Sequence, residues 1–153
     1  MIQELDRVNS LIKEFLSLSR NKTIKPERYN INHIVNAIAP IIHANALLEN
    51  KEIVVNLSEV SDILIDEKEI RQLIFNIAKN GLEAMGEKGI LYISTFQDTD
   101  STVLSIKDEG KGISTKDLGK LGTPFFTTKK DGTGLGLAIC YSIAERNSGQ
   151  ILI

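Results

Sequence analysis

The chain has 153 residues, which is enough for one domain with a real hydrophobic core and an appendage but excludes a second full domain. Hydrophobic residues make up 42% and charged residues 25%, as in ordinary soluble globular proteins, and a net charge of -2 gives no global basic field for nucleic acid. A single cysteine, Cys140, excludes an internal disulfide and suggests a reducing compartment. No signal-peptide pattern opens the chain, and no apolar run approaches the roughly 20 residues of a membrane span. We expect a soluble, cytoplasmic polypeptide, although a longer parent protein could be membrane-bound.

The apolar pattern of residues 1–20 predicts one amphipathic helix, because Leu5, Val8, Ile12 and Phe15 have heptad a and d spacing. This helix either folds back onto the domain or belongs to a coiled-coil or bundle dimer, since further leucines widen its apolar face. The following residues, 22–29, read as a linker because they are polar and contain a proline.

The next part of the chain alternates helical and extended patterns. A core helix begins after Asn30 or Asn32, either of which could cap it, and a second helix from Glu67 to Met85 begins at the capping residue Asp66. Strands are expected at 53–57, 63–65, 91–96 and 103–107, the last two forming a hairpin, and another strand begins at 150.

The helix from Glu67 to Met85 carries two asparagines on its polar face. At 100° per residue, Glu69, Asn80 and Glu83 fall within about 40° of Asn76, opposite the apolar face. Such a stripe is either a solvated surface or a ligand set, because an asparagine oxygen suits Mg²⁺ and its amide can reach a phosphate.

Asp108 lies at the end of an apolar strand and begins the sequence DEGKG. It is either a turn residue satisfied by backbone N–H groups or a carboxylate that accepts a hydrogen bond from an exocyclic amine such as that of adenine. Gly110 and Gly112 would let the backbone pass close to a ring.

The segment 113–133 is long and rich in glycine, with adjacent phenylalanines at 125 and 126 and lysines at 129 and 130. Such loops are more often functional than decorative. Thr133 could cap the last helix, whose N-terminus is a natural seat for phosphates.

Four ordered motifs, NIAKNGLEAM, DEGKGI, TPFFTTK and GTGLGLAI, resemble the N, G1, F and G2 boxes of sensor histidine kinases in the GHKL ATPase superfamily. The FFTTK and NGLEAM forms look closest to the sporulation-kinase and nitrogen-regulation branches. The resemblance covers residues 28–153, and residues 1–20 resemble the second helix of a dimerisation domain. It implies an α/β fold, a two-layer α/β sandwich in which a mixed sheet packs on helices, with a mobile ATP lid.

By this resemblance, Asn80 would coordinate Mg²⁺, Asn76 would support the metal or the phosphates, and Asp108 would hold the adenine amine. Lys129 would be a mobile phosphate contact, and Phe125 and Phe126 would pack in the lid. The other implied ATP contacts are Gly110, Gly112, Phe126, Thr128, Gly132, Thr133, Gly134, Leu135 and Gly136.

The resemblance divides the chain into a partial dimerisation and phosphoacceptor domain (1–21), a linker (22–29) and an ATP-binding domain (30–153) that we expect to be truncated at its C-terminus. The family's acceptor histidine is missing, since neither His33 nor His43 lies in its motif; both read as structural or surface residues. In hydrolysing relatives such as gyrase, a general-base glutamate stands where Asn76 is found, and a carboxamide cannot take a proton from water.

The expected function is therefore transfer of the γ-phosphate of Mg·ATP to a histidine outside this chain, with a phosphoacceptor helical hairpin as partner. A response regulator would be served indirectly, and residues 1–20 could form a homodimer. The alternatives are a GHKL protein-serine kinase or ATPase, and a nucleotide-binding interaction module without catalysis.

Overall fold

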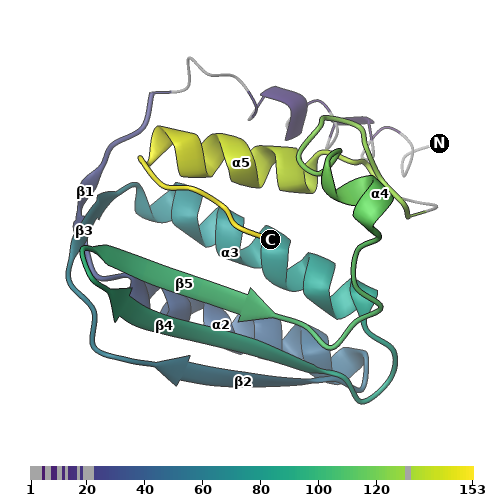
Figure 1. Ribbon diagram of the computed structural model, residues 1–153, viewed down its shortest axis with the longest axis horizontal. Helices are drawn as coiled ribbons and strands as arrows, with labels where there is room; N and C mark the ends of the chain where they lie inside the picture. Colours follow the sequence, from purple (N-terminus) through teal and green to yellow (C-terminus); the bar gives the residue numbers. More distant parts are fainter. Residues whose placement is uncertain are drawn as a thin grey trace. The chain divides into compact units, whose positions relative to one another are not determined.

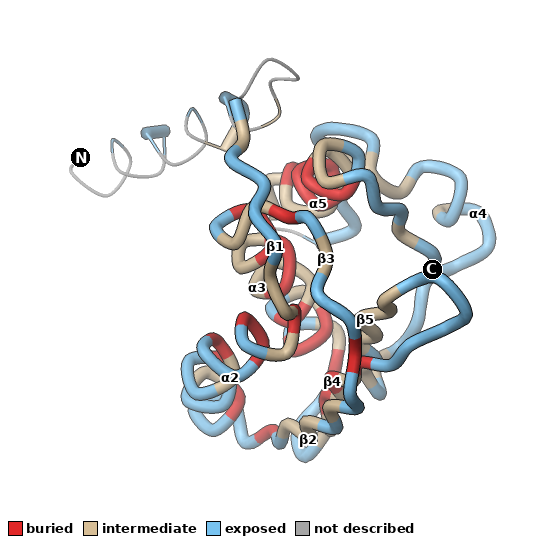
Figure 2. Tube along the Cα trace, turned by 90° about the vertical axis from the view of Figure 1, so that its left-hand side faces the viewer, coloured by how far each residue is buried: buried red, intermediate tan, exposed pale blue. Residues whose placement is uncertain are grey.

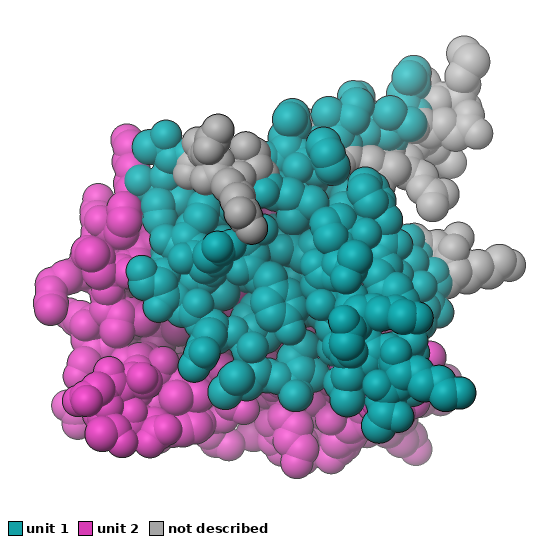
Figure 3. Space-filling view, turned by 45° about the horizontal axis from the view of Figure 1, so that its top comes forward, with its two compact units in different colours: residues 1–24, 114–153 teal, residues 25–113 magenta. Residues whose placement is uncertain are grey.

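The computed structural model describes residues 5, 8, 9, 12, 14–16, 18, 23–129 and 132–153. The chain divides into two compact units (Figure 3). Residues 25–113 form one, called here the sheet unit because it contains all the strands described. Residues 1–24 and 114–153 form the other, called here the loop unit.

The main sheet of the sheet unit is mixed. It contains β2 (Glu52–Leu57), β4 (Ile90–Asp98) and β5 (Ser101–Lys107) in the order β2-β4-β5. β4 runs parallel to β2 and antiparallel to β5. A separate two-stranded sheet pairs β1 (Glu27–Tyr29) with β3 (Ile63–Ile65). The predicted hairpin is thus confirmed, and so are the four predicted strands to within a few residues at their ends.

Two long helices, α2 (Ile31–Leu48) and α3 (Glu67–Ala84), pack against each other and on the main sheet (Figure 1). α2 contacts β2, while α3 contacts β4 and β5. The central strand accordingly buries alternate residues, Leu91, Ile93 and Thr95, as a strand does when helices cover one of its faces. The predicted fold class, a mixed sheet packed on helices, is confirmed.

Both helices begin at the side chains that the sequence indicates. Asp66 Oδ1 accepts hydrogen bonds from the backbone N–H groups of Lys68 (3.0 Å) and Glu69 (3.2 Å), so it caps α3. Asn30 rather than Asn32 caps α2, because its side-chain oxygen accepts the N–H of Asn32 at 3.1 Å. These caps satisfy N–H groups that would otherwise lack intrahelical partners.

α2 is also long and apolar enough, by length and composition alone, to span a membrane. In this fold it is a core helix, since Ile34, Val35, Ile38 and Ile42 are buried along one side of it. This stripe packs against α3 and β2, which accounts for the apolar residues on that side of α2, whereas Ile41, Leu47 and Leu48 are exposed.

The loop unit contains α4 (Thr115–Leu118) and α5 (Gly136–Arg146). The buried positions of α5, red in Figure 2, include Ile139, Cys140 and Ile143. The described residues between 5 and 16 are helical, as predicted, and Leu5, Val8 and Ile12 among them are more than half exposed. His33 and His43 are exposed, as expected for surface histidines.

Three local expectations were wrong. Residues 27–29, predicted to be linker, form β1 because β3 supplies a hydrogen-bonding partner, whereas residues 150–153 are not a strand, and Leu152 is 85% exposed. A strand requires pairing as well as an extended apolar pattern. Thr133 does not cap α5, which has Leu135 at the capping position.

Candidate functional site

The polar face of α3 presents Asn76 and Asn80 one turn apart, both half-buried and both engaged in polar or electrostatic contacts. Ile74 and Ala78 are fully buried, as the helical periodicity predicts. Glu69 departs from the prediction, because it was assigned to the polar face but is only 2% exposed. Helical periodicity fixes the direction of a side chain and not what covers it.

Asp108 follows β5 and lies against α3. A Cβ atom added at Gly81 would come within 2.7 Å of Leu91 Cδ1 and 3.2 Å of Asp108 Cβ, so the helix backbone directly approaches the end of the strand. Asp108 Oδ1 accepts the N–H of Gly110 at 2.8 Å. Within the described part of the chain, Oδ2 accepts no hydrogen bond. One oxygen of the half-buried Asp108 carboxylate thus stabilises the turn, and the other is left to accept a hydrogen bond from a further donor.

Glu109, which the sequence reasoning missed, ties this loop to the start of β4. Its Oε2 accepts the backbone N–H of Ile90 at 3.1 Å, and its Oε1 accepts the hydroxyl of Tyr92 at 3.2 Å. Desolvation and the hydrogen-bonded Glu109 carboxylate raise the pKa of the Tyr92 phenol above its ordinary value of 10.0. At neutral pH the Tyr92 phenol is therefore protonated and donates a hydrogen bond to Glu109.

The two glycines of this loop serve different purposes. A Cβ at Gly110 would lie 2.8 Å from the Ala84 carbonyl oxygen, and Lys111 N–H donates to that oxygen at 3.4 Å, so the loop runs directly over the end of α3. Gly112 has φ +70°, and apart from its chain neighbours no atom of the described residues lies within 4 Å of the place where its Cβ would be. Gly110 is thus required by packing, whereas Gly112 allows a left-handed backbone beside open space.

In the loop unit, the TPFFTTK segment folds against the GTGLG segment. Phe125 N–H donates to Gly134 O at 2.9 Å, and a Cβ at Gly134 would lie 2.6 Å from Phe125 O. Gly134 also has φ +68°, and a Cβ at Gly132 would collide with the Thr127 hydroxyl. These two glycines let the loop close on itself.

The phenylalanines in this segment differ in environment. Phe126 is half-buried, with the Lys120 ammonium 5.7 Å from its ring centroid. Phe125 is 63% exposed and has φ +69°, and it stacks on Phe15 with ring centroids 6.2 Å apart. The expectation that both would pack within the loop therefore fits Phe126 better than Phe125.

The remaining predicted contacts lie at the start of α5 or in the loop. Thr128 and Lys129 are exposed; the Lys129 N–H donates to the Thr127 hydroxyl at 3.1 Å. Thr133 accepts the Leu135 N–H at 3.3 Å and donates to Glu14 Oε2 at 3.1 Å. The Leu135 side chain is fully buried, so it is not accessible to a ligand. Lys130 lies outside the described residues.

The sheet unit therefore brings together the predicted residues of the N and G1 motifs, and the loop unit brings together those of the F and G2 motifs. No group of three or more metal-binding His, Cys, Asp or Glu side chains occurs among the residues described. At the predicted metal position, the side-chain oxygens of Asn76 and Asn80 would be the neutral ligands. Such a set fits Mg²⁺, which keeps several waters and usually takes much of its coordination from substrate phosphates.

Comparison with known proteins finds relatives along the whole chain. The family model described as Histidine kinase-, DNA gyrase B-, and HSP90-like ATPase matches residues 65–153. Sporulation kinase C of Bacillus subtilis (strain 168) is 36% identical over 155 residues, which cover 100% of this chain and 36% of that protein. This chain thus spans about a third of the length of that relative.

Two solved structures extend the comparison. The catalytic domain of the histidine kinase ThkA in a nucleotide-free form has a TM-score of 0.74 at 27% identity and covers 81% of this chain and 82% of that one. ThkA in complex with the response regulator protein TrrA has a TM-score of 0.79 at 26% identity, covering 97% of this chain and 43% of that one. The resemblance to sensor histidine kinase catalytic domains, and to the sporulation-kinase branch, is confirmed.

Gly81→Ala tests the contact between α3 and Asp108. Alanine would favour the helix by about 1 kcal/mol, but its methyl group would overlap the fully buried Leu91 and crowd Asp108. Overpacking costs about 1–3 kcal/mol, and we expect the upper part of this range because Leu91 is fully buried, so the net loss of stability in urea unfolding should be about 1–2 kcal/mol. Gly86→Ala is the matched control, since no atom of the described residues, its chain neighbours aside, lies within 4 Å of its Cβ position. A Gly81→Ala chain as stable as its parent would contradict the close approach.

Tyr92 provides a pH-dependent test of the Glu109 contacts. The pKa of Tyr92 is higher in the folded than in the unfolded chain, so the protonated phenol stabilises the fold. This contribution to the free energy of unfolding is fully present below pH 10.0, the ordinary pKa, and is lost as the pH rises through the folded-state pKa. Tyrosinate absorbance measures the titration, and its difference from Tyr92→Phe gives the contribution of Tyr92. We expect Tyr92 to titrate above pH 10.0 in the parent chain, and we expect Glu109→Gln to lower its pKa. An unchanged titration in Glu109→Gln would show that this carboxylate does not act on the phenol.

Proposed function

We propose, since this chain belongs to the histidine kinase-, DNA gyrase B-, and HSP90-like ATPase family, that it is the ATP-binding catalytic portion of a two-component sensor histidine kinase. In this proposal it transfers the γ-phosphate of Mg·ATP to a histidine outside this chain. The kinase names of its relatives and the kinase titles of its structural neighbours support this branch of the family.

The unpaired oxygen of Asp108 is the observation that carries the proposal. Oδ2 accepts no hydrogen bond from the described residues and is not a buried atom, so it is accessible to a donor from outside the chain. An exocyclic amine such as that of adenine would be such a donor, and its hydrogen bond would go to a charged group. The open space beside Gly112 adds room for the backbone to lie close to a flat ring. Gly110 N–H and the close approach at Gly81 hold the carboxylate in place for the base.

Asn80 and Asn76 would hold Mg²⁺ and the phosphates through neutral oxygen and amide groups. When bound, Mg²⁺ would neutralise charge on the phosphate oxygens. Asn76 has no basic group that can take a proton from water at the position where hydrolysing relatives are expected to have a glutamate. This difference favours transfer to a protein acceptor over hydrolysis.

The loop unit would supply the remaining ATP contacts. Phe126, Thr128, Lys129 and the segment 132–136 are assigned to the lid and to the phosphates, with Lys129 as the mobile cation. The exposure of Lys129 suits a residue that contacts its ligand only when the lid moves. Gly132 and Gly134 are required by loop closure, and the Gly132 N–H already donates to Lys129 O at 3.3 Å. The segment they belong to leads into the N-terminus of α5, whose backbone N–H groups would meet the phosphates.

The partners follow from the same assignment. A phosphoacceptor helical hairpin would present the histidine, residues 1–20 would be part of such a hairpin and of a homodimer, and a response regulator would receive the phosphoryl group afterwards. ThkA, a structural neighbour, was solved with its response regulator protein TrrA, which supports the last of these partners. We place the activity in the cytoplasm, where ATP is available.

Calorimetric titration with Mg·ATP tests the adenine assignment. We expect saturable binding by the parent chain and a loss of about tenfold or more in Asp108→Asn, because a hydrogen bond to a charged group contributes about 1.5–3 kcal/mol. Asp98→Asn, at the exposed end of β4, is the matched control and should bind like the parent. Equal affinity in Asp108→Asn would remove Asp108 from the site.

Phosphotransfer is tested by adding an acceptor helical hairpin and labelled ATP. Label that is labile in acid and stable in base identifies phosphohistidine and supports the proposal. Label on serine would favour a GHKL serine kinase, and binding without transfer would favour an interaction module. Rapid Mg·ATP hydrolysis by the purified chain would contradict the role given to Asn76.

A further inference from the structure

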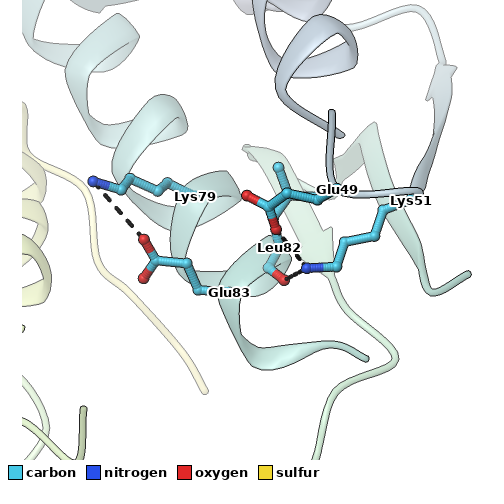
Figure 4. A network of polar contacts seen from close by, with 5 residues as sticks. All are labelled: Glu49, Lys51, Lys79, Leu82 and Glu83. Carbon is cyan, nitrogen blue, oxygen red and sulfur yellow. Dashed lines mark hydrogen bonds and ion pairs between the residues drawn. The ribbon is translucent and has the colours of Figure 1, made fainter. Parts of the chain in front are cut away.

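Lys51 is the one basic side chain that is buried among the described residues, with 7% of its surface exposed. Its ammonium contacts Glu49 Oε2 at 2.5 Å and the backbone carbonyl oxygen of Leu82 at 2.6 Å (Figure 4). A buried ammonium requires such partners, so both contacts hold it in this position. Nothing in the proposed reaction uses this residue directly.

The Leu82 carbonyl belongs to the last turn of α3, where a helix has carbonyl groups without intrahelical partners and a partial negative charge. α3 has no basic residue in its own last turn. The Met85 N–H also donates to the Leu82 carbonyl oxygen, but at 3.3 Å, which is longer than the 2.6 Å contact of the Lys51 ammonium. Lys51, more than thirty residues earlier in the chain, therefore supplies the cation that this helix end lacks.

The same helix end sets the place of the loop that carries Asp108. Ala84 O lies under Gly110 and accepts the Lys111 N–H, and Gly81 packs directly on Asp108. Asn80 is in the adjoining turn. A shift in the last turn of α3 would therefore displace the aspartate, the loop backbone and the asparagine together.

We propose that Lys51 is a positioning residue for nucleotide recognition, holding the end of α3 so that Asp108 meets the adenine. This inference rests on the proposed ATP-binding function and extends it to a residue that touches no ligand. Lys51 acts through the Leu82 carbonyl, and Glu49 keeps its ammonium in place.

The test compares Lys51→Met, which keeps the aliphatic stem, with Lys51→Arg and Lys51→Gln, which retain a hydrogen-bond donor. Lys79→Met is the matched control, because Lys79 also lies near the end of α3 but is exposed and only pairs with Glu83 at 3.8 Å (Figure 4). Each variant is measured by urea unfolding, by titration with Mg·ATP and Mg·GTP, and by hydrogen exchange of the Lys111 amide without nucleotide.

We expect Lys51→Met, at a temperature where it is fully folded, to bind ATP about tenfold more weakly and to discriminate less between ATP and GTP, since a buried carbonyl loses its charged partner. A residue that only stabilised the fold would not change the ATP to GTP ratio. Lys51→Arg should restore both quantities, Lys51→Gln should be intermediate, and Lys79→Met should match the parent.

An unchanged ATP to GTP ratio in folded Lys51→Met would overturn the proposal, as would an equal loss in Lys79→Met. If Lys51→Met does not fold, Lys51→Gln is judged by the same criteria. If the parent binds no ATP, the proposed function fails, and hydrogen exchange decides separately whether Lys51 positions the loop. Faster exchange of the Lys111 amide in Lys51→Met would support this, and unchanged exchange would overturn it.

Discussion

The close approach of the α3 backbone to the end of β5 is the contact on which the sheet-unit site depends. At Gly81 there is no side chain between the helix and Asp108, and at Gly110 there is none between the loop and the Ala84 carbonyl. A carboxylate following an apolar strand would ordinarily extend into water, but here it is held against a helix that also carries Asn76 and Asn80. The lack of two Cβ atoms therefore sets the positions of groups that lie far apart in the sequence.

The glycines of the motifs do not all have the same function. Gly110, Gly132 and Gly134 allow contacts within the protein that a Cβ would obstruct, and the backbone conformation of Gly134 adds to that requirement. Gly112 faces open space, so only its positive φ and a ligand remain as reasons for its small size. A glycine-rich motif thus identifies a region where the backbone approaches something closely, and only the structure distinguishes another part of the chain from a ligand.

The sequence predicted what depends on local chemistry. The cap at Asp66, the strands of the hairpin and the outward direction of Asn76 and Asn80 follow from residue type and periodicity, which neighbouring residues settle. It did not predict β1, the burial of Glu69 or the contact of Lys51 with Leu82. β1 and the Lys51 contact each depend on a part of the chain distant in sequence. An isolated lysine or glutamate is ordinarily a surface residue, so residue type alone did not indicate that Glu69 is buried.

On the proposed assignment, the base and the phosphates are recognised by groups of opposite electrical character. Asp108 is a carboxylate and would repel a phosphate, so it suits the adenine amine at the other end of the nucleotide. Asn76, Asn80 and backbone N–H groups are neutral, which leaves charge neutralisation to Mg²⁺ and to the exposed Lys129. On this assignment the adenine would be recognised by a carboxylate that close packing against α3 holds in place. The phosphates would instead be neutralised by Mg²⁺ and by a lysine that is exposed at the surface.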